Sequence, residues 1–239
     1  MRYFHQTLLI AILCSMGLVS AVHAESDTVK NPDPYENLNR KTHAFNETLD
    51  KYIARPAAKI YTNTLPDPVE KGVVNFFSNL DELTNIANSL LQAKFGQAAN
   101  DTGRFLINST LGIGGLFDVA SQAGLPKGEG EDFGQTLGAW GVGEGPYLML
   151  PLIGPSTLRD APARYIDSFA NPVSELEDVS ARNSLRLLGL VSTRAELLGL
   201  DDAISGDSYL FVRDVYLQRR EYLVNDGAIE DDFGDLDDY

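Results

Sequence analysis

Side chains that could carry out nucleophilic or metal-assisted chemistry are scarce in this sequence. It contains three histidines, His5, His23 and His43, and one cysteine, Cys14. A Ser-His-Asp relay needs an imidazole, and a structural zinc site needs several Cys or His ligands. Only His43 lies beyond the N-terminal segment, within a pattern typical of a helix. We therefore expect His43 to be a surface or packing residue, and we expect neither a metal site nor a cofactor.

The N-terminal segment has the features of a secretory signal peptide. Arg2 supplies a positive charge, residues 8–22 are mostly apolar, and small residues around Ala24 precede an acidic stretch. This pattern predicts a signal peptide over residues 1–24, whose removal would take away the cysteine and two of the histidines. An uncleaved membrane anchor is the alternative, although the apolar run is short for a bilayer span.

Cys14 could instead be the acylation site of a lipoprotein. Such sites usually have a small residue just before the cysteine, whereas Leu13 occupies that position here. Processing at Cys14 would also shorten the apolar run to about six residues, less than a signal peptide normally has. The sequence therefore favours cleavage after Ala24 over lipidation.

Two further groups of residues suggest chemistry that their context does not support. Glu129, Glu131 and Asp132 could act as acid and base, but such a pair needs one buried and one solvated carboxyl group. All three occur in a glycine-rich segment that we expect to be an exposed loop. The glycines of residues 111–118 and 141–145 lack the Gly-Lys-Ser/Thr of a phosphate-binding loop. We therefore expect neither acid-base catalysis nor nucleotide binding.

The most unusual segment joins a flexible stretch to an apolar one. Glycines between residues 138 and 145 precede the run YLMLPLI of residues 147–153. This run is too short to cross a bilayer and too rich in proline for a helix. It could be a buried crossing of the core, a substrate lid or a contact for lipid or a partner. Trp140 and Tyr147 are residue types that favour a membrane interface.

Asparagines recur through the central part of the chain. Asn is a mediocre helix former because its side chain competes for backbone hydrogen bonds. These residues could mark turns and caps, or they could line a wet passage that accepts polar groups without fixed charge. The residues concerned are Asn75, Asn79, Asn85, Asn88, Asn100 and Asn108.

The elements that must position these residues are helical. Asp-Pro pairs followed by Glu predict helix starts at residues 33–36 and 67–70, and Asp207 and Gly227 bound a last helix. Alternating strand patterns are weak. We predict an all-α protein with one domain over residues 25–227. Its clearest helix has apolar residues at helical spacing, namely Phe76, Phe77, Leu80, Leu83, Ala87, Leu90 and Leu91.

The charge of the chain limits its partners. The formal net charge is −15, which argues against nucleic acid because phosphate neutralisation needs clustered Lys and Arg. Residues 228–239 are acidic and contain no basic residue. We predict a disordered tail there, with contact to a basic partner as the alternative.

Several motifs together resemble the MlaA/VacJ family. The resemblance begins at residues 33–61 and continues through 75–82, 104–120, 132–160, 193–198 and 209–223, so it covers nearly the whole chain after the signal peptide. Each motif alone is unspecific, but together and in this order they are specific. The opening motif contains Asp33, Pro34, Asn39, Arg40, Phe45, Asn46, Arg55 and Pro56.

This resemblance implies an all-helical ring in the inner leaflet of the outer membrane, with a central amphipathic channel and a trimeric porin as partner. It implies a protein that is not an enzyme, which removes mislocalised phospholipids from the outer leaflet and passes them to a periplasmic carrier. Residues 132–145 would be the flexible loop beside the channel. The loop and channel candidates are Phe133, Leu137, Trp140, Gly141, Gly143, Tyr147, Leu148, Met149 and Leu150.

Two other functions remain open from the sequence. A structural adaptor for porins would have a filled centre and no lipid path. A periplasmic lipid-modifying enzyme would use His43 with a nearby acid in a closed pocket. A lipid-trafficking protein, by contrast, would expose apolar helix faces on its outside.

Overall fold

The computed structural model describes residues 31–203 and 206–228. From Pro32 onward the described residues belong to one compact unit. The predictions for the signal peptide, its cysteine and nearly all of the acidic tail lie outside the described residues. Within the described ranges, no helix is both long enough and apolar enough to cross a bilayer.

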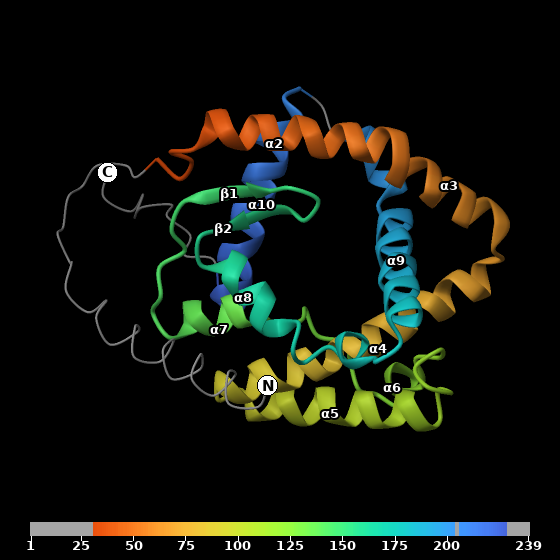
Figure 1. Cartoon of the computed structure of the whole chain (residues 1–239). Coiled ribbons are helices and arrows are strands. Elements are labelled where there is room, and N and C mark those ends of the chain that lie inside the picture. The colour runs from red at the N-terminus through yellow and green to blue at the C-terminus, as the bar shows by residue number, and fades with distance from the viewer. Residues whose placement is uncertain (1–30, 204–205, 229–239) are drawn as a thin grey trace, which may run out of the picture. The chain divides into compact units, whose positions relative to one another are not determined.

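Helices dominate the described chain, as the sequence predicts (Figure 1). The elements are, in order, α2 (Glu36–Leu49), the π-helix η1 (Asp50–Ala54), α3 (Arg55–Thr64), α4 (Asp67–Leu91), α5 (Phe95–Thr110), α6 (Val119–Gln122), α7 (Phe133–Ala139), β1 (Tyr147–Leu150), β2 (Gly154–Thr157), α8 (Asp160–Asp167), the 3-10 helix η2 (Pro172–Glu175), α9 (Val179–Glu196), the 3-10 helix η3 (Leu198–Ala203) and α10 (Ser208–Val224).

Contacts between elements that are distant in sequence close a circuit within this unit. α2 passes through η1 into α3, and both α3 and α4 pack against α9. α4 also contacts α7, α7 contacts α8, α8 contacts β2, and β1 returns to α2. α5 pairs with α4, and α10 lies behind the strands and contacts α7 and β2 (Figure 1). The segment from α7 to β2 is therefore held from several sides.

One part of the all-helical prediction needs refinement, because residues 147–157 form an antiparallel hairpin of β1 and β2. Tyr147 pairs with Thr157 and Leu150 with Gly154. Each strand has only four residues, so the alternation of buried and half-buried side chains in β1 is too short to stand out in the sequence. The prolines that exclude a helix here are compatible with a short hairpin.

The predicted helix starts have mixed outcomes. Asp207 caps α10 as predicted, since its carboxylate accepts hydrogen bonds from the amides of Tyr209 and Leu210. α4 starts within the predicted range, but it begins at Asp67 itself, so Asp67 is not the cap that its Asp-Pro pair predicts. The cap predicted at Asp33 is wrong, because α2 begins at Glu36 and the Asp33 side chain is buried at 1% exposure. Long-range partners, described below, hold this carboxylate.

The pair of helices α4 and α5 is polar on the inside and apolar on the outside. Glu82 and Arg104 are buried between them and form an ion pair of 2.7 Å. The buried side chains on these two helices are Asn79, Glu82, Asn88, Ser89, Ala98, Asp101, Arg104 and Asn108. None of the seven apolar residues that predicted α4 is buried, and Leu90, Phe95 and Leu106 are at least half exposed.

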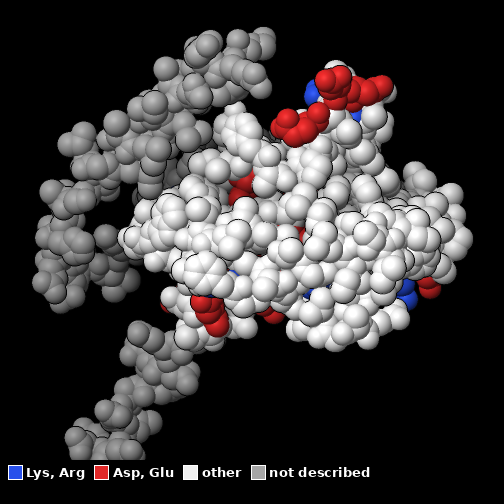
Figure 2. Space-filling view, turned by 90° about the horizontal axis from the view of Figure 1, so that it is seen from below, with Lys and Arg blue, Asp and Glu red and all other residues white. Residues whose placement is uncertain are grey.

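The outer surface shows the same distribution of side chains. On the side of α4 and α5, most of the visible surface bears neither acidic nor basic residues, and most of the visible charges lie near its margin (Figure 2). Large apolar side chains are also exposed on α2, α3, α8 and α9, among them Ile60, Tyr165 and Leu190. A surface of this kind is unusual for a protein surrounded only by water.

Candidate functional site

Two asparagine side chains of α2 hold the hairpin in place. The Asn39 amide donates to the carbonyl of Tyr147 at 3.0 Å and accepts from the amide of Met149 at 2.9 Å. Two turns further along the helix, Asn46 makes the same pair of contacts with the carbonyl of Leu150 and the amide of Leu152, both at 2.9 Å. These amides satisfy backbone groups of β1 and its turn that would otherwise lack partners.

A small aromatic cluster lies under this clamp. Asn39 also donates to the buried Asp33 carboxylate, which accepts a second hydrogen bond from the Tyr209 hydroxyl. Tyr209 packs with Tyr147 and Met149 in the one hydrophobic cluster of buried residues found in the described chain. The Arg40 guanidinium lies 4.5 Å from the centre of the Tyr209 ring. Family-motif residues therefore fix the hairpin to α2 and α10. Asn39 and Asn46 bind its backbone, and Asp33 and Arg40 hold Tyr209.

The start of α7 is fixed by a buried ionic cluster. Arg220 of α10 is 7% exposed and binds both Asp132 and Asp160, with its Nε 2.8 Å from an Asp160 oxygen. Asp160 also accepts from Arg159 Nε at 2.9 Å and from the Tyr216 hydroxyl at 2.8 Å. Burial opposes ionisation of both carboxyls, but the Arg220 charge outweighs it and lowers the pKa of each.

Gly134 lets the backbone of α7 approach this cluster. A Cβ atom at Gly134 would lie 2.4 Å from Asp160 Oδ1 and 2.7 Å from a nitrogen of Arg220. No side chain fits at that distance, and both neighbours are locked by their own bonds. The sequence shows a glycine in a short helix but gives no sign of the ionic cluster behind it.

The predicted loop residues occupy two different settings. Phe133 and Trp140 form an edge-to-face pair with ring centres 6.2 Å apart, and the Trp140 indole donates to the Leu91 carbonyl at 3.2 Å. Trp140 is 50% exposed. Gly141 has a φ of +87° just after α7, where glycine is strongly preferred, and Gly143 has open space around it.

The apolar run is divided between the core and the surface. Tyr147 and Met149 are buried in the aromatic cluster, whereas Leu148 and Leu150 are half-buried. At the tip of the hairpin Leu152 is 77% exposed, and it adopts a φ of +68°, which is rare for a residue with a branched side chain. The alternatives of core crossing and external contact therefore apply to different residues of the same run. Their assignment to a lipid channel stays a prediction.

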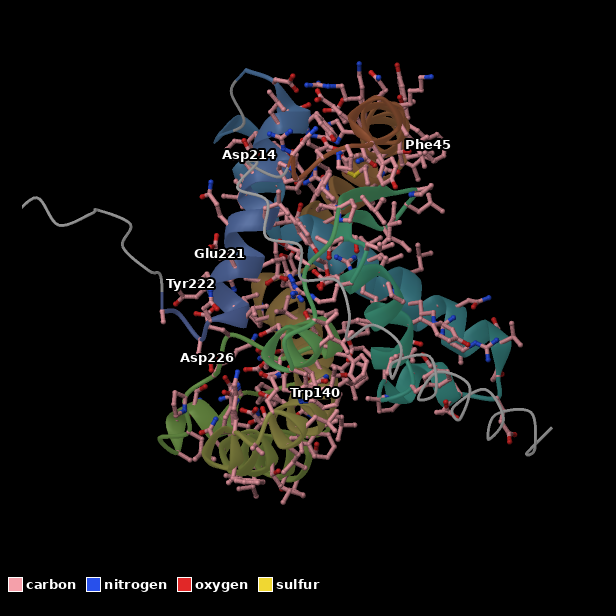
Figure 3. All side chains as sticks on the ribbon, turned by 90° about the vertical axis from the view of Figure 1, so that its left-hand side faces the viewer. Phe45, Trp140, Asp214, Glu221, Tyr222 and Asp226 are labelled. Carbon is pink, nitrogen blue, oxygen red and sulfur yellow. The ribbon has the colours of Figure 1, made fainter. Side chains whose placement is uncertain are left out.

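Other family-motif residues stabilise the outer frame or are exposed on it. Arg55 forms an ion pair of 3.0 Å with Asp201, and Pro56 stands in the first turn of α3. Phe45 is 49% exposed and points away from the side of the molecule that presents Asp214 of α10 (Figure 3). Pro34 lies just before α2.

The expectation that three carboxylates share a solvated loop is wrong for two of them. Glu129 is exposed and pairs with Arg219 at 2.7 Å. Glu131 is 6% exposed and pairs with Lys94 at 2.9 Å, while Asp132 belongs to the ionic cluster. Their cationic partners come from distant parts of the chain, so the glycine-rich context of the loop is misleading.

The asparagines of α4 and α5 have a role that neither alternative named. Asn108 binds Asp118 and the amide of Ala120, which fixes the turn after α5. Asn88 donates to Asp167 of α8 at 3.0 Å. These side chains join helices and loops to one another, so they stabilise packing between elements more than they cap helices.

A polar cavity of about 600 Å³ opens beside α7. Its walls come from one stripe of α4, the loop over residues 127–132, α7, α8 and the end of α10. Asp81 lies on the α4 stripe. Water still reaches its side chain, but partial desolvation by the surrounding walls raises its pKa to about 6. The Lys127 charge opposes this rise and Glu82 adds to it. The cavity is large enough for a small ligand.

His43 does not form a catalytic relay. Its Nε2 lies 3.0 Å from Ser208 Oγ and 3.3 Å from a Glu47 oxygen, and Ser208 donates to that same carboxylate. In a relay the acid would bind the other ring nitrogen and leave Nε2 to the serine. His43 is 9% exposed and packs edge-on against Tyr209, which agrees with the predicted packing role.

These features define a class of protein: a mostly helical chain whose outer surface suits apolar surroundings and whose polar groups gather inside. The family model described as "MlaA lipoprotein" matches residues 31–223. This chain belongs to that family.

The sequence is similar to those of several relatives over most of its length. "Intermembrane phospholipid transport system lipoprotein MlaA" of Escherichia coli (strain K12) is 37% identical over 236 residues, which cover 92% of this chain and 94% of that protein. The protein of the same name from Haemophilus influenzae is 30% identical over 233 residues, with coverages of 94% and 92%. An uncharacterized protein of Rickettsia felis is 40% identical over 193 residues, with coverages of 79% and 76%.

A solved structure has the same fold. It comes from work described as "Structural basis for maintenance of bacterial outer membrane lipid asymmetry". It is 38% identical in sequence, has a TM-score of 0.72, and covers 81% of this chain and 99% of its own.

Proposed function

We propose that this protein is the outer-membrane component of an intermembrane phospholipid transport system. It removes phospholipids that have reached the outer leaflet and so maintains the lipid asymmetry of the outer membrane. The names of the relatives and the solved structure of the same fold support this function. They also support a place in the cell envelope.

The observation that carries the proposal is the polar interior of α4 and α5 beneath an apolar exterior. Each acyl methylene contributes about 0.8 kcal/mol to membrane binding, so roughly thirty of them hold a phospholipid in place by more than about 20 kcal/mol. Spontaneous release into water is therefore negligible. A protein embedded among the acyl chains, with polar groups inside, offers the headgroup a polar path and keeps the chains shielded.

The proposal has finer features as well, which the family resemblance implies. The circuit of contacts from α2 through α9, α4 and α7 back to β1 would form a ring around the passage. Residues 132–145 would stand beside it. The ionic cluster fixes Asp132 and the start of the helix α7, so only the segment after α7, with Gly141 and Gly143, would be free to move. A trimeric porin would be the partner in the membrane, and a periplasmic carrier would receive the lipid.

Catalysis is not part of the proposal. Within the described residues no group of three His, Cys, Asp or Glu side chains could hold a metal ion. Ser208 and Glu47 both contact the same ring nitrogen of His43, so the three residues do not form a relay. The protein would work by lowering the barrier for lipid movement, and its energised partners would set the direction.

A structural adaptor for porins is the second candidate. The exposed apolar faces suit this role as well, since a porin could cover them. The adaptor would not need the polar cavity beside α7. The two functions differ in whether loss of the protein changes the lipid composition of the outer leaflet.

Deletion of the gene in its own host tests the proposal. We expect more phospholipid in the outer leaflet, measured by labelling with a reagent that does not cross the membrane. Reintroduction of the intact gene should reverse the rise. A Cys14→Ala form that is still exported should also reverse it if the signal peptide is cleaved after Ala24.

The outcomes separate the alternatives. No rise on deletion, in a host without a second copy of the gene, would contradict lipid removal and favour the adaptor. A rise that only the intact gene reverses would show that Cys14 is needed and that an acyl anchor contributes.

A further inference from the structure

Most charged side chains around the polar cavity already have partners. Glu131 pairs with Lys94, Asp132 with Arg220, and Glu129 with Arg219. Asp167 accepts from the amide of Phe133 and from Asn88. These groups build the walls, and each of them is already bonded within the protein, three by ion pairs and Asp167 by hydrogen bonds.

Two charges of opposite sign remain uncommitted. Among the residues that the structure describes, neither Asp81 nor Lys127 makes a hydrogen bond or a close ion pair, although each feels the charge of the other. Both line the same cavity, Asp81 from α4 and Lys127 from the loop that follows α6. Arg164 of α8 adds a cation whose only hydrogen bond within the described ranges goes to the carbonyl of Pro155 at 2.8 Å.

This arrangement matches a ligand that carries both signs of charge. A phosphate group needs cations and hydrogen-bond donors, which Lys127 and Arg164 supply. A primary ammonium group needs a carboxylate, which Asp81 supplies. Besides Leu223 and two glycines, the wall contains neutral polar side chains, such as Ser78, Asn85 and Gln135, which can bond to either group.

We propose that this cavity binds a zwitterionic headgroup, a phosphodiester that carries an ammonium group, with Asp81 facing the ammonium and Lys127 facing the phosphate. The inference rests on the proposed lipid-transport function and adds a preference to it. Phospholipids with an ammonium headgroup would enter the cavity more readily than purely anionic ones, because an anionic headgroup leaves Asp81 without a partner and close to negative charge.

The surroundings of the cavity favour a lipid over a free phosphodiester. Tyr165 is on α8, which contributes Arg164 and Asp167 to the wall, and Phe169 follows the end of that helix, next to the wall residue Ser168. The two rings are 64% and 58% exposed and stack edge to face at 5.1 Å. Aromatic rings next to a polar site suit the region between headgroup and acyl chain.

We expect weak binding, because the charges of the site are exposed to water. Water reaches both uncommitted charges, so each contributes little compared with a buried ion pair. A moderate preference suits transport, since a tightly held headgroup would not be released. We expect the ammonium-bearing lipid to be favoured by about threefold to tenfold, which corresponds to about 1 kcal/mol.

The test uses the full chain, purified in detergent and incubated with vesicles that contain equal amounts of phosphatidylethanolamine and phosphatidylglycerol. The protein is isolated again and its bound lipids are measured by mass spectrometry. Asp81→Asn and Lys127→Met are the site variants, and Asp81→Glu is the conservative rescue. Asp214→Asn and Lys59→Met are matched controls, because neither residue lines the cavity. Asp214 lies on α10 (Figure 3), and Lys59 is exposed on α3.

We expect the unmodified protein and both controls to enrich phosphatidylethanolamine. Asp81→Asn should lose the enrichment but still bind lipid, Asp81→Glu should restore it, and Lys127→Met should reduce binding of both lipids. Equal binding of the two lipids by the unmodified protein would overturn the headgroup inference and leave the transport function standing. Absence of any bound lipid would contradict both.

A second arm separates the two possible sources of the ligand. Soluble glycerophosphoethanolamine is added in excess during the incubation. We expect it to displace the lipid only slightly, because it lacks acyl chains. Full displacement together with loss of the lipid preference would assign the cavity to a soluble phosphodiester and overturn the lipid assignment.

Discussion

The hairpin region and the α4–α5 pair are stabilised in opposite ways. Under the hairpin, Tyr147, Met149 and Tyr209 form a small apolar cluster with polar clamps around it. Between α4 and α5 the buried groups are polar, led by Glu82 and Arg104, and the apolar side chains face outward. One region is built like an ordinary protein in water, and the other like a protein whose surroundings are hydrocarbon. From this difference we expect the α4–α5 pair to be the part of the molecule that faces acyl chains.

We expect the largest effect from removing the buried ion pair between α4 and α5. Arg104→Met would leave the Glu82 carboxylate buried without its ion pair, at a cost of about 4 kcal/mol in the free energy of unfolding. Urea unfolding in detergent micelles measures this cost. The double variant Arg104→Met with Glu82→Leu should recover part of it, because the buried Glu82 charge is removed as well, while Asp118 still lacks its contact with Arg104. Equal stability of the single variant and the unmodified protein would contradict a buried polar interface.

The next effect concerns the clamp on the hairpin. Asn39→Ala would remove the partner of the Tyr147 carbonyl and of the Met149 amide, so we expect a loss of about 3 kcal/mol. Asn63→Ala on α3 is the matched control, because Asn63 is exposed. Hydrogen exchange of the β1 amides should rise in the first variant only. Unchanged protection in Asn39→Ala would show that the hairpin does not depend on α2.

A glycine substitution probes the close approach at α7. Gly134→Ala would push against Asp160 and Arg220, and we expect it to cost about 2 kcal/mol. Gly96→Ala is the control, since that helical position has nothing within 4 Å of an added Cβ. That change should stabilise α5 by about 0.5–1 kcal/mol. Thermal unfolding of the two variants in the same detergent should therefore shift in opposite directions.

A smaller effect of the opposite sign is expected inside the aromatic cluster. The Tyr147 hydroxyl is buried and has no hydrogen-bond partner among the described residues. Tyr147→Phe removes this group and should stabilise the protein by about 1 kcal/mol. Tyr209→Phe should destabilise it instead, because the Tyr209 hydroxyl donates to Asp33. A stability loss in both variants would mean that the Tyr147 hydroxyl has a partner, such as water.

The smallest effect depends on pH. The pKa of Asp81 is raised to about 6 in the folded protein. Between the ordinary pKa of an aspartate and pH 6, the folded protein therefore keeps a proton on Asp81 that the unfolded chain has released. Stability contributed by this proton is lost as pH rises through 6. Asp81→Asn should therefore raise the Tm at pH 7.5, and the gain should vanish near pH 4. A gain that is independent of pH would show that Asp81 does not titrate in this range.

The sequence predicts well what depends on neighbouring residues. Asp207 caps α10 because the cap needs only the next three residues, and the spacing of Phe76, Leu80 and Leu83 defines α4. The same spacing does not tell which face is buried, because apolar periodicity looks the same whether the partner is a protein core or lipid. For α4 the buried face turned out to be the polar one.

Partners that are distant in sequence explain what the sequence could not predict. Asp132 looked solvated because glycines surround it, yet its cation, Arg220, is 88 residues away. Asp33 resembles a helix cap because a proline follows it, but its actual partner, Tyr209, is 176 residues away. Asn39 and Asn46 were noticed only through the family resemblance, since a seven-residue spacing of amides has no local meaning until a strand lies beside the helix.

The clamp made by these two asparagines also leaves fewer backbone groups of β1 open to pairing with another chain. A two-stranded sheet has two free edges, each able to recruit a strand from another chain. Here the side-chain amides of Asn39 and Asn46 occupy the outer edge of β1, while α8 and α10 pack against β2. The chain can thus present apolar helices to its surroundings without offering another molecule a template for strand addition.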